Sequence, residues 1–148
     1  MNTEPQVSEI QVSYYPRLIQ SQKITSSSDA VEIIRKAWDN RTIEMQEEVK
    51  LILLNQSNTV LGIYNLSKGG INSSLVDVRL ILSVALKCLA TGVILVHNHP
   101  SGNLNPSKSD LDIVKKLNES CKLLDITLLD SIIITKESYM SFGDDGML

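Results

Sequence analysis

Aromatic residues are scarce in this sequence, which has one Trp, four Tyr and one Phe among its 148 residues. The core must therefore be mostly aliphatic. Hydrophobic residues make up 43% of the chain and charged residues 21%, which is typical of a folded protein and not of a disordered one. The length is the commonest size for one domain, so we expect residues 1–148 to form a single globular unit with a loose tail at 1–8.

An excess of positive charge is also missing, since the formal net charge is −3 and the isoelectric point is near 5.3. Such a chain has no overall field to hold a phosphate backbone. Four lysines, Lys108, Lys115, Lys116 and Lys122, do gather in one predicted helix, where such a set is more often a solvated face than a binding patch. The charge therefore does not support nucleic acid as a partner.

Cysteines and long apolar runs are equally sparse. Cys88 and Cys121 lack the spacing of a metal finger or a disulfide framework, and they predict buried free thiols in a reducing compartment. No apolar run approaches the ~20 residues that cross a bilayer. The opening MNTEPQVSEI is polar and acidic, unlike a signal peptide. We therefore expect a cytoplasmic protein with no membrane partner.

The apolar residues that are present follow helix and strand periods in alternation. The predicted helices cover about 28–40, 78–90 and 107–124, the second ended by Gly92 and the third opened by Ser107. The predicted strands cover 10–16, 47–55, 59–67, 93–96, 126–135 and 139–142. This order predicts an α/β fold in which a mixed β-sheet is sandwiched by about three helices.

The only two histidines, His97 and His99, stand in V-H-N-H-P at the end of the buried strand VILV. In a strand, residues i and i+2 point the same way, so both imidazoles can be directed to one point. Neutral imidazole is the commonest metal ligand in proteins. A solvent-facing pair in a loop is the simpler alternative, because a bare H-x-H occurs often by chance.

Asp110 follows eleven residues after His99, in the first turn of the helix that Ser107 opens. Two imidazoles and one carboxylate leave a tetrahedral zinc with an open position, as in catalytic rather than structural zinc sites. Ser107-x-x-Asp110 also has the form of a capping box, in which Asp110 would only satisfy backbone N–H groups. Both interpretations stay open at this point.

The full pattern H-x-H-P-x6-S-x-x-D, formed by His97, His99, Pro100, Ser107 and Asp110, matches the JAMM motif. The longer stretch HNHPSGNLNPSKSD closely resembles the C-terminal domain of the RadC family. GGINSSLVDVR and LLDSIIITKESYMSFGDDG are also similar to RadC segments, so the resemblance covers roughly residues 40–148. It implies a JAB/MPN fold, with a layout like that of cytidine deaminases.

The resemblance further implies a zinc-dependent metallohydrolase, with one Zn²⁺ per chain held by His97, His99 and Asp110. An upstream glutamate would act as general base in cleaving an amide or isopeptide bond of a peptide substrate. Glu47 fits that position best, and Glu48 is the neighbour that a shift of one residue would select. Ser107 would help to stabilise the oxyanion, although its capping role explains it equally well.

The sequence also departs from the family pattern. Most RadC sequences carry a histidine where this chain has Ser131, and many have H-P-R-E near residues 76–80, where this chain reads VDVRL. The helix-hairpin-helix region of RadC proteins is not expected, because residues 1–40 predict only a strand and one helix. The alternative function is a non-catalytic JAB-fold module that binds protein or DNA in a repair-related role. A Mg²⁺-dependent nuclease would want more carboxylates.

Overall fold

A five-stranded mixed sheet forms the centre of the protein, whose computed structural model describes residues 7–17, 21–69 and 76–148. The strands are β1 (Glu48–Leu54), β2 (Val60–Lys68), β3 (Gly92–Asn98), β4 (Thr127–Ile134) and β5 (Tyr139–Ser141), in the spatial order β2-β1-β3-β4-β5. Only β3 and β4 are parallel, and α3 (Lys108–Leu123) connects them. All seven residues of β1 and of β3 are buried, as expected for central strands covered on both faces.

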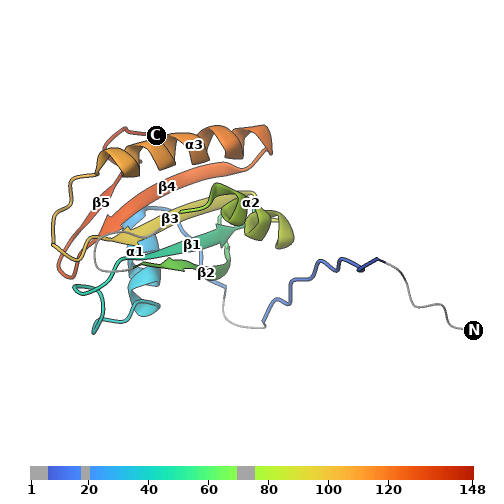
Figure 1. Cartoon of the computed structure of the whole chain (residues 1–148), viewed down its shortest axis with the longest axis horizontal. Coiled ribbons are helices and arrows are strands. Elements are labelled where there is room, and N and C mark those ends of the chain that lie inside the picture. Colours follow the sequence, from blue (N-terminus) through green and yellow to red (C-terminus); the bar gives the residue numbers. More distant parts are fainter. Residues whose placement is uncertain (1–6, 18–20, 70–75) are drawn as a thin grey trace, which may run out of the picture.

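Three helices cover the two faces of this sheet (Figure 1). The helices α2 (Val78–Lys87) and α3 pack on one face, where Ile81 and Leu117 meet alternate residues of the strands. The helix α1 (Ser27–Lys36) packs on the other face through Ala30, Val31 and Ile34. The predicted α/β fold, a mixed sheet between three helices, is confirmed. None of the helices in the described ranges is long and apolar enough to cross a membrane.

Alternation along the strands divides their side chains between two cores. Val49, Leu51 and Leu53 of β1 face α2 and α3, whereas Ile52 and Leu54 face α1. The same alternation places Val93 and Leu95 of β3 toward α2 and α3, and Ile94 and Val96 toward α1. Within these strands, a residue's place in the alternation therefore indicates the face of the sheet that its side chain occupies.

Two expectations about individual elements were wrong. The strand predicted at 10–16 is absent, because residues 7–17 are exposed and have no helix or strand. Gly92 does not end α2, which stops at Lys87. Leu89, at φ 55°, turns the chain, while Gly92 begins β3, where a Cβ would lie 2.8 Å from Leu129.

The end of the first helix also differs from its prediction. The helix α1 stops at Lys36, short of the predicted 40, and Trp38 turns back into the α1 core. The expected loose tail lies mainly outside the described residues, as does much of the RadC-like segment GGINSS, because residues 1–6 and 70–75 are not described.

Candidate metal centre

The carboxyl end of β3 carries both histidines. His97 is the sixth residue of the strand and is 8% exposed, and His99 follows directly after the strand ends. Leu95 faces α2 and α3, and His97 and His99 follow it by two and four residues. Both side chains therefore lie on the face that α2 and α3 cover. The buried strand thus directs two imidazoles into the space beneath the start of α3, as its i, i+2 spacing predicts.

Asp110 reaches the same space from the first turn of α3. Its Oδ2 accepts the Ser107 N–H at 2.8 Å, and the Ser107 Oγ accepts the Asp110 N–H at 3.1 Å, so the capping box is present. The same carboxylate also lies beside both histidines. Capping and facing the histidines are therefore not alternatives, because the cap orients the carboxylate toward them.

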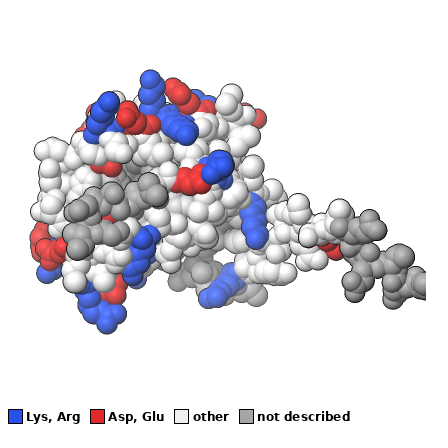
Figure 2. Space-filling model, in the orientation of Figure 1, with Lys and Arg blue, Asp and Glu red and all other residues white. Residues whose placement is uncertain are grey.

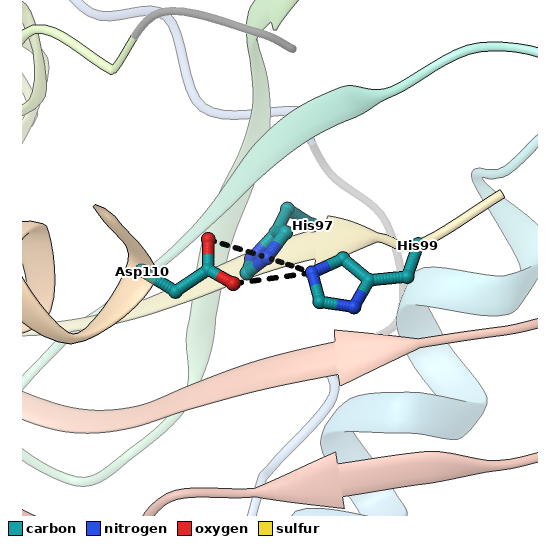
Figure 3. A group of neighbouring side chains, drawn as sticks. All are labelled: His97, His99 and Asp110. Atoms are coloured by element: carbon teal, nitrogen blue, oxygen red, sulfur yellow. Dashed lines mark hydrogen bonds and ion pairs between the residues drawn. The ribbon is translucent and has the colours of Figure 1, made fainter. Parts of the chain in front are cut away.

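The three side chains point at one another, as Figure 3 shows. The His97 and His99 Nε2 atoms are 3.1 Å apart, the His99 Nε2 lies 3.2 Å from the Asp110 Oδ2, and the His97 Nε2 lies 3.3 Å from the Asp110 Oδ1. Tetrahedral zinc with bonds of about 2.0–2.1 Å separates its ligands by about 3.3–3.4 Å. These spacings fit a single cation, and His97, His99 and Asp110 are a group that could hold one.

The loop after β3 fixes which nitrogen of His99 faces this point. The His99 Nδ1–H donates to the Asn103 carbonyl oxygen at 2.6 Å, so in the neutral ring the Nε2, on the side of Asp110, is the nitrogen with the lone pair. Gly102, at φ +84°, donates its N–H to the His99 carbonyl and makes the tight turn that presents Asn103. Two ring nitrogens and a carboxylate are electron-pair donors, so the set suits a bound cation.

The charges of the site interact strongly. Burial opposes ionisation of Asp110, but hydrogen bonds from His97 and His99 outweigh burial and hold the pKa of its carboxyl far below the usual range. The hydrogen bond that the protonated His99 ring donates to the Asp110 carboxylate raises the pKa of His99 above its ordinary value, against the opposing effect of burial. The carboxylate is therefore ionised at neutral pH, as a metal ligand must be.

The two candidate glutamates differ in the face they occupy. Glu48 is in β1, four residues before Ile52 and thus on the α1 face of the sheet, and its carboxylate pairs with Lys68 at 3.3 Å. Glu47 directly precedes β1 and lies two residues before Val49, which pairs with His97 across the sheet. The pKa of His99 is raised first by the hydrogen bond to Asp110, and the negative charge of Glu47 adds the smallest of the contributions. Of the two glutamates, Glu47 is therefore the one whose position and charge bear on the histidines.

Ser131 stands where the family histidine is expected. It is fully buried in β4 beside Leu95 of β3, and its Oγ has no hydrogen-bond partner among the described residues. It makes no described contact with the metal-binding group, which holds its geometry without it. The departure from the family pattern therefore leaves the metal centre intact.

The role of Asn103 in orienting His99 could not be predicted from the sequence, because it acts through its backbone carbonyl and any residue type could supply that atom. The Gly and Asn content of the loop was the only signal for the turn. Asn98, between the two histidines, was also missed. Its complete burial is visible only in the structure.

Comparison with known proteins gives one family and several curated relatives. The family model for the RadC-like JAB domain matches residues 24–147. A UPF0758 protein of Flavobacterium johnsoniae is 45% identical over 130 residues, which is 88% of this chain and 56% of that protein. A UPF0758 protein of Porphyromonas gingivalis is 42% identical over 104 residues, or 70% of this chain and 46% of that protein. The chain spans about half the length of these relatives.

Proposed function

This chain belongs to the RadC-like JAB domain family, and from its metal centre we propose that it is a zinc-dependent metallohydrolase that cleaves an amide or isopeptide bond. The observation that carries the proposal is the convergence of His97, His99 and Asp110 at spacings of 3.1–3.3 Å. Three protein ligands suit a catalytic zinc because the fourth position stays open for water or substrate. The substrate would be a peptide or an isopeptide-linked protein.

Zinc in such a site would lower the pKa of a water molecule to about 7 and polarise the scissile carbonyl. Glu47 is proposed to accept the proton of that water and to return it to the leaving amine. Its position on the histidine face and its electrostatic effect on His99 support this role. Glu48 is unsuited to it, because it lies on the opposite face in a pair with Lys68.

Ser107 is proposed to help stabilise the oxyanion that forms during hydrolysis. Its Oγ accepts the Asp110 N–H at 3.1 Å, and a hydroxyl that accepts a hydrogen bond still has its own hydrogen to donate. Capping α3 and donating to substrate are therefore compatible. Because Ser107 is exposed, a substrate can approach it from solvent.

The charge distribution favours a protein substrate over nucleic acid. Acidic and basic side chains intermingle on the face shown in Figure 2, where no broad basic area appears. On α3 the exposed Lys115 and Lys116 stand between Asp112 and Glu119, which are exposed as well. A DNA-binding module would need a concentrated basic surface to hold phosphates. We also propose a cytoplasmic location, which the free Cys88 and Cys121 support.

The experiment combines metal analysis with matched glutamate variants. The purified protein is expected to hold about one zinc per chain. Glu47→Gln should keep that zinc but hydrolyse peptide and isopeptide substrates about 10²–10⁴-fold more slowly, the usual contribution of a general base. Glu48→Gln and the exposed Glu44→Gln should retain most of the rate. If wild type binds zinc but cleaves nothing on a broad panel, the chain is a non-catalytic JAB-fold module.

A further inference from the structure

Asn98 lies between the two histidines, and its side chain faces away from the metal centre. It is completely buried, and its parity within β3 matches that of Ile94 and Val96, which face α1. A buried amide is costly unless its polar atoms are hydrogen-bonded. Its hydrogen bonds therefore indicate what it does for the site on the other face of the sheet.

All of those bonds go to one segment, residues 43–48. The Asn98 Oδ1 accepts the Glu48 N–H at 2.7 Å, and the Nδ2 donates to the carbonyls of Ile43 at 2.7 Å and Gln46 at 2.8 Å. Both N–H donors of the amide are thus used, together with its acceptor. The three partners flank Glu47 on both sides, although they are fifty or more residues from Asn98 in the chain.

We propose that Asn98 is a positioning residue that holds Glu47 at the metal centre, an inference that rests on the proposed function. The pairing of β1 with β3 ends at Val49 opposite His97. One step further, the Asn98 amide binds the Glu48 N–H and continues the connection between the strands. Extended by two residues beyond its last pair, Val49 with His97, the same register would set Glu47 opposite His99. Asn98 thereby fixes, from the rear face, which glutamate meets the histidines on the front.

Asparagine is the side chain that these partners require. Aspartate could accept the Glu48 N–H, but its oxygens would then face the Ile43 and Gln46 carbonyls with no hydrogen to donate. An apolar residue would leave three buried backbone groups without partners. A second connection runs from the Gly69 N–H to the Glu47 carbonyl at 2.9 Å, at the end of β2. It ties the segment to β2, whereas Asn98 ties it to the strand with the ligands.

The test uses the full chain loaded with zinc and compares Asn98→Ala and Asn98→Asp with Ser141→Ala. Ser141 donates a buried hydrogen bond to Asp130 at 2.6 Å at the other side of the sheet, so its loss is a matched control. Hydrogen exchange, followed by mass spectrometry, should accelerate in residues 43–48 for both Asn98 variants and stay unchanged there for Ser141→Ala. Zinc affinity should fall less than the about 10–100-fold typical of changes to groups bonded to metal ligands.

Activity supplies the second readout, through a double-mutant cycle. Asn98→Ala should lower kcat about 10²-fold in the wild-type background, as expected for a misplaced catalytic group, with a small change in KM. In the Glu47→Gln background it should lower kcat little further, because the group it positions is already gone. A residue that only stabilises the fold would lower the rate equally in both backgrounds.

Three results would overturn the inference: unchanged exchange in residues 43–48, loss of zinc together with the looser segment, or equal rate losses in the two backgrounds. Failure of the proposed function would look different. If Glu47→Gln leaves the rate intact, the assignment of Glu47 as general base is wrong. If wild type is inactive, the assignment as a hydrolase is wrong. The exchange and zinc measurements then still decide whether Asn98 holds the segment without disturbing the ligands.

Discussion

Two regions are proposed to form the site, and they differ in how they are positioned. One runs from the end of β3 to the start of α3, and the other is the segment 43–48. The first delivers His97, His99 and Asp110 from neighbouring parts of the chain, through a strand end, a loop and a helix cap. The second contains the proposed general base Glu47, far away in the sequence, and is held by hydrogen bonds to Asn98 and Gly69. The ligands are thus set by local structure, and the glutamate by long-range contacts, so the two should respond separately to mutation.

The largest effect is expected at Asp110. Asp110→Asn keeps an oxygen that can accept the Ser107 N–H, but it removes the anionic ligand, so zinc affinity should fall by more than the about 10–100-fold of outer-shell changes. Asp110→Ala should lose the zinc too, and the missing cap should cost about 1 kcal/mol more in the free energy of unfolding. Zinc titration and urea unfolding measure the two effects. If the two regions are independent, hydrogen exchange in residues 43–48 stays as in wild type.

The metal-binding unit should also respond to pH. Without metal, the raised pKa of His99, due first to Asp110, stabilises the fold below the ordinary histidine pKa of about 6.5, and this is lost as pH rises through the raised value. Zinc needs unprotonated imidazoles, so its stabilisation grows with pH instead. A chelator should therefore lower the unfolding temperature more near pH ~8 than near pH ~5. An equal effect at both values would contradict binding through these histidines.

A smaller effect is expected at Gly102, which shapes only the loop between the ligands. Its φ of +84° makes alanine strained by about 1–3 kcal/mol, although a Cβ there would meet no atom within 4 Å. The turn that presents Asn103 to His99 should distort, and zinc affinity should fall roughly tenfold. Gly146→Ala is the matched control, since Gly146 has φ +69° and equally open space away from the site. It should cost similar stability and leave zinc affinity unchanged.

The smallest effect is expected at Ser131, which belongs to neither region. Within the part of the chain that the structure describes, its buried Oγ has no partner, so Ser131→Ala removes an unsatisfied hydroxyl without breaking a hydrogen bond. The free energy of unfolding should stay the same or rise by up to about 1 kcal/mol. Thermal unfolding and zinc titration measure both quantities. A clear loss of zinc would mean that this position does support the metal centre.

Much of the fold could be predicted from the sequence, because its strands and helices carry strong apolar periods. The buried run VILV and the capped helix from Ser107 needed no tertiary information. The strand predicted at 10–16 was wrong because β propensity needs a partner strand, and residues 7–17 make no ladder. The end of α2 was misplaced because Leu89 adopts the left-handed conformation that the sequence suggested for Gly92.

The sequence by itself determined the candidate ligand set, because His97, His99 and Asp110 lie on adjacent elements whose geometry follows from local periodicity and capping. Only the tertiary structure gives a reason to prefer Glu47 over Glu48 as the proposed general base. Neighbouring residues of a strand point to opposite faces, so a choice between them depends on the register of β1 against β3. That register is fixed by contacts such as those of Asn98, whose partners lie fifty or more residues away.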